Sequence, residues 1–565
     1  MSDSAPTLIL TGGQVLTIDS QFRVAEGVAL RGREVLATGT DTEMRALAGP
    51  STSIVELAGR AVLPGINDSH LHGVAYGMTK PPFAVNVGHP AVASIADIVR
   101  VVGDAARSTD AGGWVVGIGW DPGYLAECLA DRRRFPHRRD LDTVAPDVPV
   151  CLTDFSSHMM WVNSAALRLC GIDVLTPAPD GGVIDRDSEG QPTGILREAA
   201  QMLVQSALPS PTVAQRKTAI QSVVQNLHSR GITSYTEPGL GPGGDKTLFG
   251  GLGTDNWIAY SELATAGDLN ARVSVLLLPA PIGGSAEDVC KGLTELHRPG
   301  SADSRILNAI GVKIFADGVP PNRTAWMKEP YTGGGHGSLC VHGNSPALQT
   351  DELYEMIRVA HEAGYQLGVH VTGDHAIDLV VDAFLAAEAA VPRPDARHYI
   401  IHGDFIGGES LAKLAAKGYG VNMNPAIKWT ISDLMEEVVG AERSAYQWPV
   451  RSAMEAGVTV CASSDAPVTE PDWRQGVASM MLRESKASGR TSGPEQRVTL
   501  AQALRAYTSA PAWQDFAEDW KGTLEPEKAA DVCVLDRPLL DLDPHALTEV
   551  QVDLTVFDGR IVFER

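Results

Sequence analysis

The chain has 565 residues, of which 44% are hydrophobic and 20% charged, and its formal net charge is −23. This length exceeds one ordinary compact core, so we expect a large domain with attached pieces. The acidic balance argues against nucleic-acid binding, because a phosphate backbone would be repelled. The basic stretch at 131–140 has an acid at each end and a proline inside it, which favours a solvated loop.

The N-terminal stretch MSDSAPTLIL has neither the basic segment nor the apolar core of a signal peptide. No uninterrupted apolar run reaches membrane-spanning length. The seven cysteines are scattered and never form a C-x-x-C pair, which argues against a disulfide framework and a cysteine zinc site. We therefore expect a cytoplasmic protein with no nucleic-acid or membrane partner.

Both ends of the chain predict short strands. Residues 1–62 hold Val, Ile, Leu and Thr runs broken by glycine-containing turns, and residues 521–565 hold similar runs around an Asp-Gly turn. Neither end is long enough to form a stable sheet alone. We expect the two ends to meet in one small, discontinuous β-sandwich domain.

The middle of the chain, residues 63–520, alternates apolar β-branched runs with amphipathic helical stretches. This alternation predicts a parallel sheet covered by helices on both sides. The number of repeats favours a distorted (β/α)₈ TIM-like barrel, although an open sheet fits the same pattern. The alternation fails at about 86–208, which we interpret as an insertion with its own structure near the barrel mouth.

Six polar side chains stand within or just past the C-terminal ends of predicted strands: His70, His72, Lys313, His370, His402 and Asp465. In a parallel barrel these ends meet at one rim. His70 and His72 are two residues apart, so in a strand they point the same way and can bind one ion together. Imidazole and carboxylate groups suit Zn²⁺ and similar divalent ions.

Each of these residues also has an ordinary explanation. An H-x-H pair alone is weak evidence, and a single strand-end histidine such as His402 is commonly a hydrogen-bonded structural residue. Lys313 alone fits a lysine that extends its ammonium group to water, and Asp465 alone fits a helix cap. The complete set, with every member at a strand end, favours a metal site.

The motifs around these residues carry a family resemblance. The stretches LPGINDSHLH, VKIFADG, HVTGDHAID, IHGDF and SSDAPV occur in this order along the chain, and SSHMMWVNSAAL and PTGILRE lie inside the insertion. Together they resemble the amidohydrolase superfamily, specifically the branch typified by N-substituted formamide deformylase (amidohydrolase family 3). The resemblance covers nearly the whole chain.

This resemblance implies one or two divalent ions, with Zn²⁺ expected, held by His70, His72, Lys313, His370, His402 and Asp465. It implies a carbamylated Lys313 as a bridging ligand and Asp465 as general base and then acid, with His402 as a second catalytic residue. The expected reaction is hydrolysis of a non-peptide C–N bond in an amide, N-substituted formamide or N-acyl compound. The same centre fits a deaminase or a lactone, carbamate or cyclic-amide hydrolase, and a non-catalytic scaffold is a further alternative.

Substrate contacts are expected from His158, Trp120, Asp121 and Arg323, although a packed turn explains Trp120 and Asp121 equally well. After FADG the chain reads VPPNRTAW where the branch commonly has Ser-Leu-Gly-Ser-Arg-Thr, so the loop beside the site is rebuilt. His375 and His398 are predicted to be structural. A homo-oligomer would be ordinary for such a protein, but no sequence feature sets its symmetry.

Overall fold

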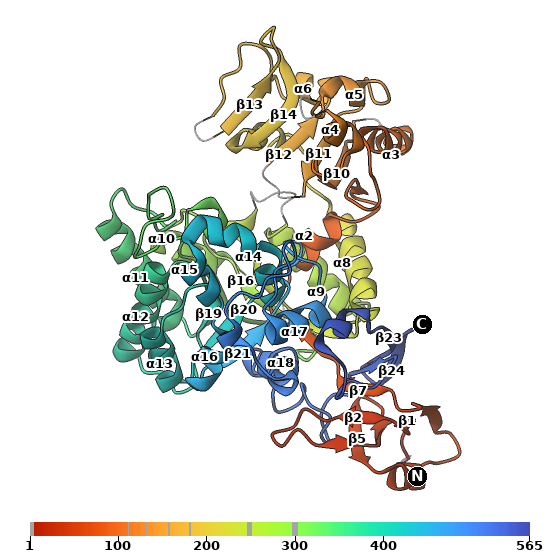
Figure 1. The fold of residues 1–565 in the computed structure, drawn as a ribbon. Coiled ribbons are helices and arrows are strands. Elements are labelled where there is room, and N and C mark those ends of the chain that lie inside the picture. The colour runs from red at the N-terminus through yellow and green to blue at the C-terminus, as the bar shows by residue number, and fades with distance from the viewer. Residues whose placement is uncertain are drawn as a thin grey trace. The chain divides into compact units, whose positions relative to one another are not determined.

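The computed structural model describes residues 5–110, 112–131, 134–155, 159–179, 182–245, 251–296 and 303–565. These residues form two compact units. The first lies within Met1–Gly73, Lys217–Asp245 and Leu252–Arg565, and the second lies within Val74–Arg216 and Lys246–Gly251. Figure 1 shows the elements of both units.

The first unit contains an eight-stranded parallel sheet in the order β21-β20-β19-β18-β17-β16-β15-β8. All nine residues of β15 are buried, as expected for a strand covered on both faces. The strands are β8 (Ile66–Asp68), β15 (Ile232–Leu240), β16 (Arg272–Leu277), β17 (Leu307–Phe315), β18 (Gln366–Val371), β19 (Tyr399–His402), β20 (Gly420–Met423) and β21 (Thr459–Ala462).

Hydrogen bonds just past β8 and β21 bring the two outer strands of this sheet together. Ser69 Oγ donates to the carbonyl of Ala462 at 2.8 Å. The N–H of Asp465 donates to the carbonyl of His70 at 2.9 Å. The sheet is therefore a nearly closed barrel, and the predicted fold class is confirmed.

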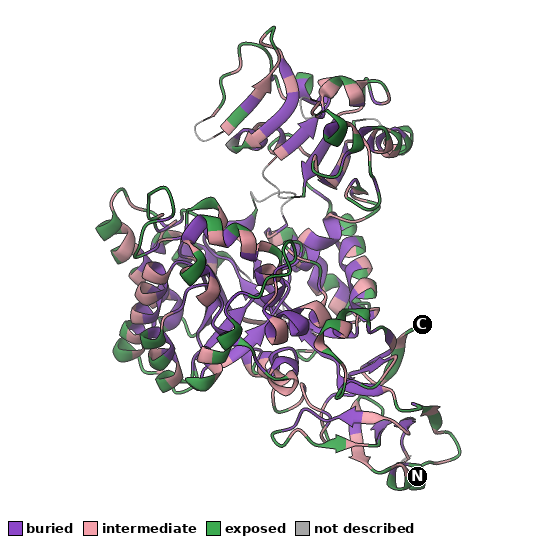
Figure 2. Ribbon diagram, viewed as in Figure 1, coloured by how far each residue is buried: buried purple, intermediate pink, exposed green. Residues whose placement is uncertain are grey.

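Helices connect and cover the barrel strands. In α12 the buried residues include Ile377, Val380, Val381 and Phe384, whose spacing of three to four places them on one face of the helix. Figure 2 shows buried strands inside and exposed residues on the outer helix surfaces. The helices are α8 (Val213–His228), α9 (Thr254–Ala266), α10 (Ala286–Glu295), α11 (Pro346–Glu362), α12 (Asp374–Ala390), α13 (Gly408–Lys417), α14 (Pro425–Val439), α15 (Ala441–Tyr446), α16 (Val450–Glu455), α17 (Trp473–Leu482), α18 (Leu500–Ala506) and α19 (Ser509–Gln514).

The two ends of the chain share one six-stranded sheet in the order β24-β23-β22-β7-β2-β3. Strand β7 pairs with β2 from the N-terminal part and with β22 from the C-terminal part. A four-stranded sheet, β5-β4-β1-β6, shares a hydrophobic core with it. These elements are β1 (Leu8–Thr11), β2 (Gln14–Leu16), β3 (Val24–Ala25), β4 (Gly27–Arg31), β5 (Glu34–Gly39), α1 (Asp41–Ala46), β6 (Ser53–Glu56), β7 (Ala61–Pro64), β22 (Val532–Leu535), β23 (Val552–Phe557) and β24 (Arg560–Glu564).

The second unit has its own six-stranded mixed sheet, β13-β14-β12-β11-β10-β9, and its own hydrophobic cores. It takes in the predicted insertion at about 86–208 and extends beyond it on both sides. Its elements include β9 (Val85–Asn86), α3 (Ile95–Ser108), β10 (Val115–Trp120), α4 (Ala126–Ala130), α5 (Arg138–Asp142), β11 (Val150–Asp154), β12 (Met159–Val162), α6 (Ser164–Leu169), β13 (Gly182–Arg186), β14 (Pro192–Glu198) and α7 (Met202–Gln205); α2 (Gly73–Met78) joins it to the first unit.

Within the part of the chain that the structure describes, every helix is too short or too polar to serve as a membrane span. All seven cysteines are free thiols.

Candidate metal centre

The six predicted ligands lie at the C-terminal ends of five barrel strands. His70 and His72 follow β8, Lys313 is third from the end of β17, His370 is next to last in β18, His402 is last in β19, and Asp465 follows β21. Because the strands are parallel, these ends meet at one rim of the barrel.

Donor atoms from several of these residues gather at that rim. The ligand atoms of His70, His402 and Asp465 all lie within 4.8 Å of one another. Asp465 Oδ1 is 3.2 Å from Nε2 of His70 and 3.4 Å from Nε2 of His72. The ring centroid of His370 is 4.6 Å from that of His402. Four imidazoles and one carboxylate are therefore neighbours, as a metal site requires.

The buried side chain of Asp68 holds the two segments that carry His70 and Asp465. Its Oδ1 accepts hydrogen bonds from the N–H groups of Ser464 at 3.1 Å and His70 at 3.4 Å. Burial raises the pKa of Asp68 to about 7. The N–H of His72 also donates to the carbonyl of Ala466 at 2.9 Å. Main-chain and side-chain bonds thus fix the relative positions of these segments.

Hydrogen bonds assign the tautomers of two histidines. Asn424 donates its Nδ2 to Ser463 Oγ at 3.0 Å, so its Oδ1 is the acceptor for Nδ1–H of His402 at 2.7 Å. His370 donates its Nε2–H to the carbonyl of Gly318 at 3.2 Å. In each ring the other nitrogen keeps its lone pair for an ion.

The charge states of these groups suit metal coordination. Burial holds the pKa of His70 and His370 well below the ordinary value and lowers the pKa of His402 to about 4. Burial alone would raise the pKa of Asp465, but the interactions with His70 and His72 outweigh it and keep this pKa well below its usual range. Near neutral pH these three imidazoles are neutral and the aspartate is ionised, which are the forms that bind metals.

Lys313 is 2% exposed, and burial lowers the pKa of its ammonium group to about 7, although the charge of Asp465 acts in the opposite direction. Its Nζ lies 4.8 Å from the ring centroid of Phe315. A large fraction of this amine is therefore neutral and nucleophilic near pH 7.

Two of the predicted ligands sit in strained backbone conformations. The φ angle is +74° at His402 and +55° at Asp465, in the left-handed region that residues other than glycine rarely adopt. Such a conformation costs roughly 1–3 kcal/mol and is concentrated at functional sites. The strain therefore agrees with a functional role for this rim.

Two predicted substrate contacts lie in the second unit. Trp120 is fully buried in the core of that unit, and its Nε1 donates to the carbonyl of Leu152 at 2.9 Å. Asp121 accepts the N–H of Gly123 at 2.7 Å and so closes a turn. This geometry favours packing and turn formation over substrate contact for both residues. His158 lies outside the described residues.

Arg323 lies in the first unit, on the rebuilt loop after β17. It follows the short helix η4 (Pro320–Asn322), is exposed, and has a φ of +58°. Thr324 Oγ1 accepts the N–H of Val319 at 3.0 Å, which closes this turn. His375 lies in the first turn of α12, as predicted.

Three residues at the rim were not among the predicted site residues. Glu237 is fully buried on β15, with Oε1 at 3.8 Å from His72 Nδ1. Asn424 follows β20 and Phe315 ends β17. All three stand near the C-terminal ends of predicted strands, and this position also singled out the six candidate ligands. None of the three belongs to a recognisable metal-binding motif, so the sequence did not single them out.

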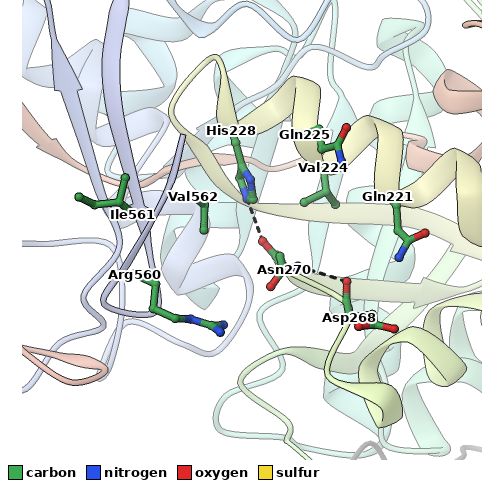
Figure 3. A pocket seen from close by; sticks show the side chains of 9 residues that line it. All are labelled: Gln221, Val224, Gln225, His228, Asp268, Asn270, Arg560, Ile561 and Val562. Atoms are coloured by element: carbon green, nitrogen blue, oxygen red, sulfur yellow. Dashed lines mark hydrogen bonds between the residues drawn. The ribbon is translucent and has the colours of Figure 1, made fainter. Parts of the chain in front are cut away.

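A groove of about 470 Å³ lies near the N-terminal ends of β15 and β16, opposite the rim. Figure 3 shows the side chains that line it. It is lined by the C-terminal turns of α8, the turn before β16 and strand β24. In it, His228 donates Nε2–H to the carbonyl of Asn270 at 2.8 Å. None of the six predicted ligands lines this groove.

Comparison with known proteins identifies the family. The family profile described as "Amidohydrolase family" matches residues 53–563. The chain belongs to the amidohydrolase family. This amidohydrolase is 30% identical over 562 residues to the N-substituted formamide deformylase of Arthrobacter pascens. The aligned region covers 99% of this chain and 98% of the relative.

Solved structures share the fold. An uncharacterized metal-dependent hydrolase from Pyrococcus furiosus has a TM-score of 0.72 and 27% identity, with 95% of this chain and 99% of that chain covered. A second such hydrolase, from Pyrococcus horikoshii OT3, has a TM-score of 0.73 and 23% identity over the same shares of both chains.

Proposed function

We propose that this amidohydrolase is a metal-dependent hydrolase that cleaves a non-peptide C–N bond of a small molecule. The observation that carries the proposal is the position of Asp465 Oδ1, which lies 3.2 Å and 3.4 Å from Nε2 of two histidines at the functional rim of the barrel. The similarity to N-substituted formamide deformylase supports amides, N-substituted formamides and N-acyl compounds as the substrate class.

We propose Zn²⁺ as the ion, with one or two ions per chain, because neutral imidazole and carboxylate ligands suit it. Lys313 is proposed to contribute as a carbamate. The neutral Nζ attacks CO₂, a C–N bond forms, and the amine loses a proton to solvent. The product carries two oxygen ligands in place of an ammonium group that cannot bind a cation.

A divalent ion in this site would supply Lewis acidity, which lowers the pKa of a coordinated water towards ~7. Asp465 accepts the proton of the attacking water as its oxygen approaches the carbonyl carbon. Asp465 then donates this proton to the leaving nitrogen, because an amide anion is too basic to depart unprotonated. We retain His402 as the second catalytic side chain, since its ring is fixed by Asn424 and lies at the same centre.

The test combines metal analysis of the purified protein with a substrate panel of N-substituted formamides, acyl anilides, lactones, carbamates, cyclic amides and amino-substituted rings. We expect bound divalent metal and release of a carboxylate and an amine. Ammonia release without a carboxylate would show a deaminase, and turnover of lactones alone would remove the C–N assignment. Absence of divalent metal together with full activity of Asp465→Asn would overturn the whole proposal.

A further inference from the structure

A buried carboxylate on the second barrel strand faces the back of His72. Glu237 Oε2 accepts hydrogen bonds from the hydroxyl of Tyr260 at 2.9 Å and from the N–H of Gly73 at 2.8 Å. The hydroxyls of Tyr235 and Tyr260 are 2.8 Å apart. Because the Tyr260 proton is given to Glu237, the Tyr235 hydroxyl is the donor in this second bond. The Oε2 atom is thus held by a short chain of donors.

The chain after His72 comes unusually close to this cluster. A Cβ at Gly73 would lie 2.6 Å from the hydroxyl of Tyr260 and 3.1 Å from that of Tyr235. Only glycine therefore lets the main chain approach closely enough for its N–H to reach Glu237. The glycine that ends the H-L-H-G stretch thus has a direct role in holding the carboxylate beside the histidine.

The second oxygen of Glu237 points to the remaining ring nitrogen of His72. The Oε1 atom is 3.8 Å from His72 Nδ1, while Nε2 of the same ring lies 3.4 Å from Asp465 Oδ1 at the metal centre. Within the described residues, His72 Nδ1 is buried and has no hydrogen-bond partner. A buried ring nitrogen in this state costs free energy until a partner reaches it.

In two other histidines of the centre, the ring nitrogen that faces away from the centre already has a hydrogen-bond acceptor. The outer nitrogen of His402 donates to the amide oxygen of Asn424 at 2.7 Å, and that of His370 donates to the carbonyl of Gly318 at 3.2 Å. His72 has a carboxylate oxygen beside its outer nitrogen, but at 3.8 Å it lies about 0.6 Å beyond the usual hydrogen-bonding range.

We propose that Glu237 is a positioning residue for His72: when a divalent cation binds Nε2, Oε1 accepts the Nδ1–H of the same ring. This inference rests on the proposed function, because it requires a metal at the rim. The carboxylate fixes the tautomer that presents Nε2 to the ion. It also makes His72 a stronger donor than a histidine paired with a neutral oxygen.

The test measures Zn²⁺ affinity by competition with a chromophoric chelator, using wild type, Glu237→Gln and Tyr235→Phe. Loss of such an outer partner typically weakens metal binding about 10–100-fold, which is the change expected for Glu237→Gln. Tyr235→Phe is the matched control: it removes a hydroxyl from the same cluster but leaves both hydrogen bonds to Glu237, so the affinity should stay at the wild-type value. The visible spectrum of the Co²⁺-loaded protein should change in Glu237→Gln and not in Tyr235→Phe.

Tyr260→Phe covers the case in which Glu237→Gln does not fold, because it removes one of the two hydrogen bonds to Oε2 of Glu237 and keeps the carboxylate. It should weaken Zn²⁺ binding less than Glu237→Gln does. Wild-type affinity and an unchanged Co²⁺ spectrum in the folded Glu237 or Tyr260 variant would overturn the positioning role while leaving the proposed function intact. A wild-type protein that binds no Zn²⁺ would overturn both.

Discussion

Two histidine clusters stand at opposite ends of the same barrel and differ in how their ring nitrogens are used. At the N-terminal ends of the strands, the N–H of Leu367 donates to Nδ1 of His398 at 3.0 Å. Nε2–H of His398 then donates to Nδ1 of His361 at 2.7 Å, and Nε2–H of His361 donates to the carbonyl of Val391 at 2.8 Å. Every ring nitrogen of this pair is satisfied within the protein.

At the C-terminal rim, by contrast, His402 and His370 each use one nitrogen for a protein acceptor and leave the other for the centre. Nε2 of His70 and Nε2 of His72 face the same carboxylate oxygen of Asp465. Burial and residue type are shared by the two clusters, so neither identifies a ligand. The comparison teaches that hydrogen bonding separates the two clusters: both nitrogens of each histidine are bonded at one end, whereas nitrogens available to an ion gather at the other.

The largest expected effect falls on the rim. Asp465→Asn keeps the size of the side chain but cannot take up the proton, so kcat should fall by about 10²–10⁴-fold. Steady-state kinetics on a substrate found by the panel measures this loss, and thermal unfolding serves as the control for folding. Unchanged turnover would contradict the role of Asp465 as proton acceptor and donor.

Lys313→Ala should lose much of the bound metal and most of the activity, because the proposed carbamate oxygens are removed. Short carboxylic acids such as acetate or propionate should partly restore both, since they can occupy the space of the missing side chain and supply oxygen ligands. Metal content and turnover are measured with and without the added acid. Full metal and full turnover in the unsupplemented variant would rule out the carbamate.

His398→Phe should lower the stability of the protein without lowering its metal content, in contrast to a substitution at the rim. It leaves the buried Leu367 N–H and the Nδ1 of His361 without partners, at a cost of about 1–3 kcal/mol for each group. Urea unfolding should show the lost stability, while metal content per folded chain stays at the wild-type level. A variant of normal stability that lacks metal would break the distinction between the two clusters.

The smallest effect is a change in the pH dependence of stability. Burial holds the pKa of His398 well below 6.5 in the folded protein, whereas the unfolded chain has the ordinary value. The contribution of this histidine is therefore complete above pH 6.5 and declines as the pH falls towards the folded-state pKa. Uptake of one proton on unfolding changes the free energy of unfolding by up to about 1.4 kcal/mol per pH unit.

In unfolding experiments between pH 5 and 7.5, the stability of His398→Phe should consequently fall less steeply with acid than that of wild type. Because the rim histidines also have lowered pKa values, the informative quantity is the difference between the two proteins. Parallel curves would show that His398 does not titrate in this range.

The barrel was predictable because its strands are buried on both faces and so read as apolar runs between amphipathic helices. The gathering of the six candidate residues at one rim was predictable because each stands at or near the C-terminal end of a strand, and these ends meet in a parallel barrel. The pairing of the chain termini followed from the inability of either end to form a sheet alone, and β7 provides the pairing.

Other features had no such pattern. In the stretch GIGWDPGY, Trp120 fits a pocket residue and a core residue equally well, and its burial in the core and its hydrogen bond to the Leu152 carbonyl favour the second. Glu237 is the single charged residue of β15, and no motif marks it, because the residues that hold it come from other segments of the chain. Contacts of this kind depend on register and depth in the barrel, which local sequence does not encode.

Strand β7 has a consequence for how the protein matures. Only one residue separates β7 from β8, the strand that leads to His70 and His72, yet β7 is flanked in its sheet by β22, residues Val532–Leu535. A nascent chain that has been synthesised only as far as Asp465 already contains all six candidate ligands. It still lacks β22, the strand that pairs with β7 just before His70 and His72. We expect ion capture to follow the synthesis and pairing of β22, and proteins shortened before β22 to load metal poorly.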